Sequence, residues 1–164
     1  MDRKNRGYSL IELIVTIAIL GIVTTGLALG LSFVNGRPAD QCARNLKMAL
    51  TNHRLSTMGK ESASIRIYMD SDGSVWTEEK LDGNPTTNKV CGRGVSVKIV
   101  SSTSGEKEMA PGVNDLTISF NRYNGSFNLG NDIEYLEISK ASHRYKLVFY
   151  NLTGKVSLER ITTP

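Results

Sequence analysis

Residues 7–20 have the sequence GYSLIELIVTIAIL and open a long apolar segment. Glu12 is the single charged residue of this stretch, and the next 22 residues, Leu13 to Val34, carry no charge. A helix of that length spans roughly 30 Å, which is the thickness of the hydrocarbon core of a bilayer. The sequence therefore predicts a membrane-spanning helix that carries one carboxylate close to its start.

The charges around this segment are unequal. Arg3, Lys4 and Arg6 precede it, whereas Arg37 behind it is offset by Asp40. Since basic residues tend to stay on the cytoplasmic side, the sequence predicts a single-pass protein with a cytoplasmic N-terminus and an exported C-terminal domain. The rest of the chain is nearly balanced, with 17 basic and 15 acidic residues after residue 6.

Two common explanations of an apolar N-terminus leave features unexplained. A secretory signal peptide has a shorter apolar region and a small-residue cleavage site, for which Ala28-Leu29-Gly30 is a poor candidate. An ordinary membrane anchor has the right length but gives no reason for Glu12.

The segment RGYSLIEL, Arg6 to Leu13, resembles the class III signal of type IV pilins and pseudopilins. In that family a basic leader is followed by Gly, an aromatic residue, Ser or Thr, two aliphatic residues, Glu and an aliphatic residue. Every element is present, with Tyr8 where Phe is commoner. The resemblance implies that a membrane-embedded prepilin peptidase cuts between Gly7 and Tyr8 and methylates the new amine of Tyr8. Gly7 suits the cut because it lacks a Cβ and lets the peptidase approach the backbone.

The resemblance also implies a role for Glu12. Its carboxylate would pair with the Tyr8 amine of a neighbouring subunit during assembly, in a filament core of low dielectric where such a pair is held more strongly than in water. The alternative is an interfacial Glu12 that reaches the lipid headgroups.

Beyond the apolar segment the pattern changes twice. Gly36 and Pro38 predict a kink or a short interruption. Helical spacing then predicts a second, amphipathic helix from Ala39 to about Met58 with Gly59 as its stop. Its apolar face would consist of Cys42, Ala43, Leu46, Leu50 and His53. We interpret His53 as a packed, hydrogen-bonded core residue rather than a ligand.

From Ser64 onward apolar residues alternate with a period of two, which is typical of strands. The predicted strands are residues 64–69, 74–79, 94–100, 115–120, 133–139, 145–151 and 155–161. Turns are expected at residues 70–73 and 152–154, and residues 81–89 and 101–111 are predicted to be loops.

A helix followed by antiparallel strands predicts an α+β fold. The arrangement resembles the pilin fold, in which a long N-terminal helix, half transmembrane and half amphipathic, packs on an antiparallel sheet. The stretches ISFNRYNGSF (118–127) and VFYNLTGKVSL (148–158) are also similar to C-terminal strands of minor pseudopilins of the GspH/FimT type. The expected organisation is a leader (1–7), a transmembrane or filament-core helix (8–35), the amphipathic half of that helix (36–60) and a globular antiparallel sheet domain (61–164).

The chain has two cysteines, Cys42 and Cys91. An exported domain with one pair favours a disulfide. Two reduced, buried cysteines are an equally open alternative at this stage.

No catalytic, cofactor or metal motif is present, so we do not expect an enzyme. Asp70-Ser71-Asp72-Gly73 resembles the start of a calcium loop, but the twelfth position, which should be a bidentate Glu, is Leu81. We predict a β-turn there. We do not expect DNA as a partner, because the basic cluster at residues 140–146 has Glu134 and Glu137 nearby.

The resemblance thus implies a structural subunit, and a minor one, of a type IV pilus or related filament, located first in the cell membrane and then in a pilus or pseudopilus. The implied partners are the prepilin peptidase, sibling pilins, the inner-membrane assembly platform with its ATPase, and lipid before assembly. A type II secretion or competence pseudopilin is an alternative. Further alternatives are an uncleaved, membrane-anchored binding domain and a secreted enzyme.

Overall fold

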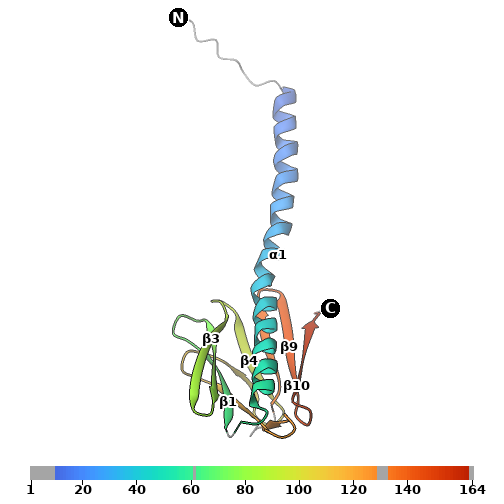
Figure 1. Ribbon diagram of the computed structural model, residues 1–164. Helices are drawn as coiled ribbons and strands as arrows, with labels where there is room; N and C mark the ends of the chain where they lie inside the picture. Colours follow the sequence, from blue (N-terminus) through green and yellow to red (C-terminus); the bar gives the residue numbers. More distant parts are fainter. Residues whose placement is uncertain (1–9, 61, 129–132, 163–164) are drawn as a thin grey trace, which may run out of the picture. The chain divides into compact units, whose positions relative to one another are not determined.

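The computed structural model describes residues 10–60, 62–128 and 133–162, apart from the side chains of residues 24–36. This part of the chain contains one helix, α1 (Leu10–Thr57), followed by strands (Figure 1). The chain divides into two compact units, residues 1–35 and 36–164. The fold is therefore α+β, as the sequence predicts, with the strands confined to the second unit.

The helix passes through Pro38 without a break. The predicted interruption at residues 36–38 is therefore wrong. Proline removes one backbone donor and crowds the preceding turn, but the flanking hydrogen bonds of a 48-residue helix maintain the helical backbone across it. The predicted stop is confirmed, because α1 ends at Thr57 and Gly59 has a φ of 81°, a conformation that favours glycine after a helix.

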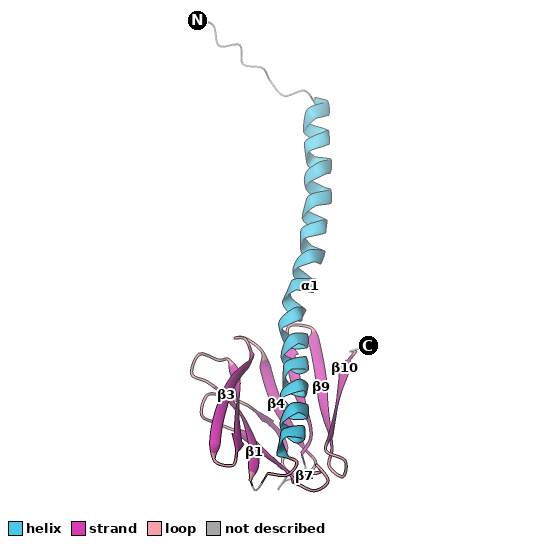
Figure 2. Cartoon of the chain, viewed as in Figure 1, coloured by secondary structure: helices cyan, strands magenta, loops and turns pink. Residues whose placement is uncertain are grey.

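The strands form two five-stranded antiparallel sheets rather than one (Figure 2). The first sheet has the order β3-β2-β1-β6-β7, and the second has the order β10-β9-β8-β4-β5. The bounds are β1 Ala63–Met69, β2 Val75–Leu81, β3 Asn84–Cys91, β4 Ser96–Ser101, β5 Gly105–Glu108, β6 Leu116–Phe120, β7 Phe127–Asn128, β8 Ile133–Lys140, β9 His143–Tyr150 and β10 Lys155–Ile161.

All seven strands predicted from alternation are confirmed, as β1, β2, β4, β6, β8, β9 and β10. The turn at residues 70–73 is also confirmed, because the Gly73 amide donates to the Asp70 carbonyl over 2.9 Å. The hairpin turn before β10 is closed by the Gly154 amide, which donates to the Tyr150 carbonyl over 2.8 Å.

The two predicted loops are partly wrong. Residues 84–91 form β3, which pairs with β2 through a two-residue turn at Asp82 and Gly83, where φ is 49° and 85°. Asp-Gly is a strong hairpin signal, and the polar, non-alternating sequence of β3 conceals the strand behind it. Residues 105–108 form β5, an edge strand whose four residues are all exposed. Edge strands of this kind bury no side chains, so they produce no alternation.

The core of the second unit lies between α1 and the two sheets. The predicted helix face is confirmed, since every one of its five residues is at most 1% exposed. Leu46 and Leu50 pack there with inward side chains of both sheets, among them Ile67, Ile118 and Leu147. Burying each leucine contributes roughly 1.5–3 kcal/mol, so this face holds α1 on the sheets.

A row of aromatic rings joins the two sheets at one end of the core. His53 lies 5.7 Å from Phe120, Phe120 lies 4.9 Å from Phe127, and Phe127 lies 5.3 Å from Phe149, measured between ring centroids. Phe120 and Phe127 belong to the first sheet and Phe149 to the second. The row therefore links α1 and both sheets across their seam.

Three backbone segments meet beside the last turns of α1. The Arg54 Nε donates to the Gly125 carbonyl over 3.0 Å. Gly125 and Gly154 are in direct backbone contact, so that a Cβ at Gly154 would overlap the Gly125 carbonyl oxygen and lie 2.9 Å from Arg54 Nε. We call this contact of Arg54, Gly125 and Gly154 the glycine junction. It fastens the loop after β6 and the β9–β10 hairpin to the helix.

Candidate functional site

The sequence places the functional signal at the start of the chain. Gly7 and Tyr8 lie outside the described residues. Glu12 lies in the first turn of α1 as described and is exposed.

The apolar side chains around Glu12 are uncovered in the first unit. Leu10 is 77% exposed, Ile22 is 74% exposed, and each large apolar side chain between them is at least 47% exposed. An exposed apolar patch of this extent is typical of a site that contacts a membrane or another protein. Within the described residues, no helix meets the combined requirement of length and apolar character for crossing a membrane.

Cys42 and Cys91 form a disulfide in the structure. Both are buried, and their Cα atoms are 4.6 Å apart although 49 positions separate them in sequence. Beside them the Asn45 side-chain amide donates to the Val90 carbonyl over 2.9 Å. These contacts hold the end of the edge strand β3 against α1.

His53 lies on the inner face of α1 and is fully buried. Its Nδ1 lies 3.2 Å from Glu79 Oε2 on β2, while its Nε2 has no hydrogen-bond partner among the described residues. Burial lowers the pKa of His53, and the hydrogen bond to Glu79 opposes this shift without reversing it. His53 is therefore a neutral core residue held by one carboxylate.

This lowered pKa predicts a pH-dependent stability. The unfolded chain takes up the proton near the ordinary pKa of about 6.5, whereas folded His53 takes it up only at a lower pH. Stability is then complete above that pH and decreases as the pH falls below it, by at most about 1.4 kcal/mol per pH unit for one proton. Urea unfolding between pH 7 and pH 5 measures the slope.

His53→Gln should remove this slope, because glutamine does not titrate. His143→Gln is the matched control, since His143 lies at the β8–β9 turn rather than in the core. If the slope of stability against pH persisted in His53→Gln and disappeared in His143→Gln, the titrating residue would be His143, and the prediction for His53 would be wrong.

Asp70-Ser71-Asp72-Gly73 is a turn stabilised from within. Asp72 accepts hydrogen bonds from the Ser74 hydroxyl and from the Ser74 amide, the latter over 2.8 Å. These bonds, followed by those from Arg93 and the charge of Lys89, lower the pKa of Asp72. Two cations therefore already neutralise the carboxylate that a calcium ion would need. No three His, Cys, Asp or Glu side chains in the described part of the chain are placed to hold a metal.

The basic residues near the β8–β9 turn are engaged with the domain itself. Arg144 lies 3.1 Å from Glu137, Lys146 lies over the Tyr135 ring at 4.4 Å, and Lys140 donates to the Arg93 carbonyl over 3.3 Å. These contacts give a local structural role to each of the three cations.

Comparison with known proteins identifies the N-terminal segment. Residues 2–28 match the family model of the prokaryotic N-terminal methylation motif. The matched segment is about a sixth of the chain. No curated protein and no solved structure matches the chain. The chain thus carries the prepilin-type signal of type IV pilins and pseudopilins, and its Gly7, Tyr8 and Glu12 lie inside the matched segment.

Proposed function

We propose that this chain is a structural, non-enzymatic subunit of a type IV pilus or a related filament, and a minor one. It is cut between Gly7 and Tyr8 by a prepilin peptidase, methylated on Tyr8, and assembled through α1. The observation that carries the proposal is the methylation motif at residues 2–28 at the head of a helix whose apolar side chains are exposed. The α+β fold of the second unit agrees with a pilin-like domain.

Assembly gives the exposed side chains of α1 a partner. Before assembly they lie in lipid, with the N-terminus in the cytoplasm and the second unit exported. In the filament the same surface contacts the helices of sibling subunits, and burying each large apolar side chain there contributes roughly 1.5–3 kcal/mol. The transfer between these two environments requires the inner-membrane assembly platform and its ATPase, which we include among the partners.

In this proposal the carboxylate of Glu12 sets the register of one subunit against the next. Cleavage leaves a positive amine on Tyr8, and Glu12 of one subunit pairs with that amine on the next. Removing one partner of a charge pair in a low-dielectric filament core costs about 3–5 kcal/mol of stability, because the other charge stays buried without a partner. Assembly with Glu12 in place is thereby favoured over assembly in other registers.

The processed state and the role of Glu12 are tested together in the native cells. We expect the N-terminal peptide of the wild-type protein to begin at Tyr8 and to be heavier by one methyl group in mass spectrometry. Glu12→Val should be processed in the same way, but its incorporation into sheared filaments should fall by at least about tenfold.

Two control variants separate the steps. Thr16→Val lies one turn further along α1, and the Thr16 hydroxyl donates only to the Leu13 carbonyl of the same helix over 2.8 Å, so processing and incorporation should stay at wild-type levels. A bulky Gly7→Ile should retain the leader. Wild-type incorporation of Glu12→Val would refute the pairing, and an intact Met1 in the native protein would favour the uncleaved anchor.

A secretion pseudopilus and a competence pseudopilus use the same signal and the same helix, so the residues discussed here serve them equally. A secreted enzyme would begin near Leu31 and lose the whole matched segment.

A further inference from the structure

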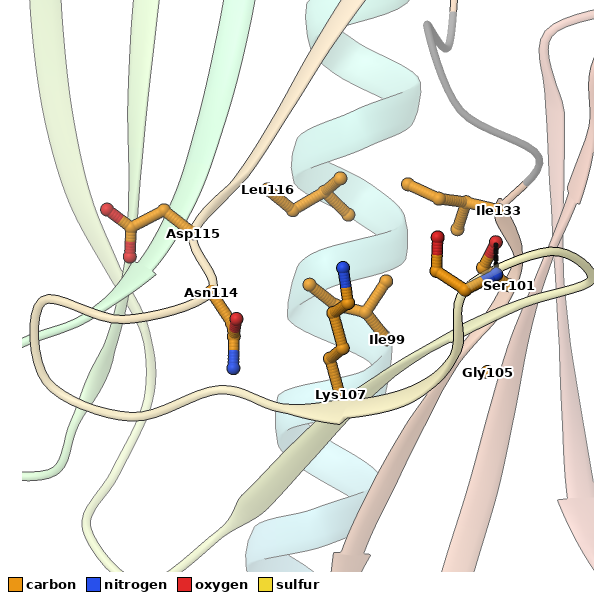
Figure 3. A pocket seen from close by; sticks show the side chains of 9 residues that line it. Ile99, Ser101, Gly105, Lys107, Asn114, Asp115, Leu116 and Ile133 are labelled. Atoms are coloured by element: carbon orange, nitrogen blue, oxygen red, sulfur yellow. Dashed lines mark hydrogen bonds between the residues drawn. The ribbon is translucent and has the colours of Figure 1, made fainter.

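A small cavity lies where the two sheets approach each other away from the aromatic row. It has a volume of about 140 Å³ and is bounded by β4 and β5 of the second sheet and by the residues leading into β6 of the first (Figure 3). None of the sequence motifs discussed above contributes to it.

Lys107 is the charged group directed into this cavity. It pairs with Ile99 across the β4–β5 ladder, so it lies on the inward face of the second sheet. In Figure 3 its amine points toward the side chains of Ile99 and Leu116. The side-chain amine of Lys107 forms no hydrogen bond or ion pair with any described residue.

The acidic neighbours of Lys107 are committed elsewhere. Glu106 lies 3.6 Å from Lys98, and Glu108 accepts a hydrogen bond from the Ser96 hydroxyl over 2.6 Å. Asp115 lines the cavity but is bound by Arg66 of β1, whose Nε donates to it over 3.1 Å, and Figure 3 shows its carboxylate directed away from Lys107. Arg66 engages only Oδ2 of Asp115, and Asp115 Oδ1 is buried without a hydrogen-bond partner among the described residues. Lys107 is therefore the cation of the described cavity lining that has no ion-pair partner, whereas the charge of Asp115 is paired with Arg66.

The inner wall of the cavity is apolar. Ile99, Leu116 and Ile133 supply it, and all three are buried in the core. Ser101 and Asn114 lie on the rim, but the Ser101 hydroxyl already accepts the Ser104 amide over 3.3 Å and the Asn114 amide donates to the Glu108 carbonyl over 2.7 Å. A ligand would thus meet an apolar wall and the ammonium group of Lys107, with the Arg66-paired carboxylate of Asp115 at the side of the cavity.

We propose that this cavity binds a carboxylate carried on a compact apolar group. The ammonium of Lys107 pairs with the carboxylate, and Ile99, Leu116 and Ile133 enclose the apolar part. The volume decides the size, because a cavity of about 150 Å³ holds a benzene molecule. Such a group is found at the C-terminal residue of a polypeptide with an apolar last side chain and in a small organic acid.

A competing explanation of Lys107 is protection of the sheet edge. β5 is the edge strand of the second sheet, and an inward-pointing charge is one way in which proteins prevent edge-to-edge pairing. That role requires the charge but no ligand, so a binding measurement distinguishes the two.

The test uses the full chain in zwitterionic detergent micelles with 4-fluorobenzoate, observed by fluorine NMR against empty micelles. We expect saturable binding that weakens as salt is added. The neutral 4-fluorobenzamide should bind about fivefold more weakly, which corresponds to one partly screened ion pair. Absence of saturation, or equal binding of the amide and the acid, would overturn the proposal and leave an edge-protecting lysine.

Variants assign the binding to Lys107. Lys107→Met keeps the aliphatic length at an exposed position and should weaken fluorobenzoate binding about fivefold, whereas Lys107→Arg should stay close to wild type. Lys98→Met, on the outer face of the same sheet, is the matched control and should bind normally. Wild-type affinity of Lys107→Met would contradict the site.

Peptides then identify the source of the carboxylate. A peptide that ends in leucine with a free carboxylate is compared with its C-terminal amide. Tighter binding of the free peptide than of fluorobenzoate supports the site and indicates a polypeptide terminus. Binding of fluorobenzoate alone also supports the site and indicates a small organic acid.

Discussion

Gly154→Ala is expected to destabilise the second unit by about 3–5 kcal/mol, a combination of overpacking and a strained backbone. At the glycine junction a Cβ on Gly154 would overlap the Gly125 carbonyl oxygen. The obstacle is backbone, so it cannot be relieved by rotating a side chain. Because φ at Gly154 is 62°, an L-residue there is also in a disfavoured conformation. Urea unfolding followed by the fluorescence of Trp76, the single tryptophan, measures the loss.

Gly112→Ala separates the two causes. Gly112 has a similar φ of 70°, but a Cβ there meets nothing within 4 Å. This control should lose only about 1–2 kcal/mol, the cost of the left-handed conformation for an L-residue. Equal unfolding midpoints for the two variants would mean that the loop after β6 and the β9–β10 hairpin separate easily, and that the junction contributes little.

Reduction of the Cys42–Cys91 disulfide is expected to lower the unfolding free energy by about 4 kcal/mol, the value for a loop of this length in the chain-entropy description. The two cysteines are 49 residues apart, and the closed loop contains the end of α1 and strands β1, β2 and β3. Without the bond the unfolded chain regains the freedom of that loop. The measurement is urea unfolding of the oxidised and the reduced wild-type chain.

A double variant, Cys42→Ala with Cys91→Ala, controls for other effects of the reductant. Its unfolding should resemble that of the reduced chain and should not respond to reductant. If the oxidised and reduced wild-type proteins unfolded at the same urea concentration, the contact of β3 with α1 would rest on packing and on the Asn45–Val90 hydrogen bond alone.

Much of the fold was predictable because its signals are local. The helix face of residues 39–58 follows from a period of 3.6, and seven strands follow from a period of two. The strands that escaped, β3, β5 and β7, are polar edge strands or only two residues long, so burial leaves no pattern in them. The Asp82-Gly83 turn was the one local signal that could have revealed β3.

The sequence by itself determined the N-terminal signal, with Gly7, Tyr8 and Glu12 at fixed offsets before an uncharged segment. The motif implies processing by a prepilin peptidase and assembly with other pilin subunits, and it is recognised from the order of residues along the chain. Only the tertiary structure decided which distant groups meet: Cys42 with Cys91, His53 with Glu79, Gly154 with Gly125, and Lys107 with an apolar cavity. The physical reason is that these contacts join α1 to strands, or one sheet to another. They depend on how two sheets divide the ten strands of the described residues between them, which no local period encodes.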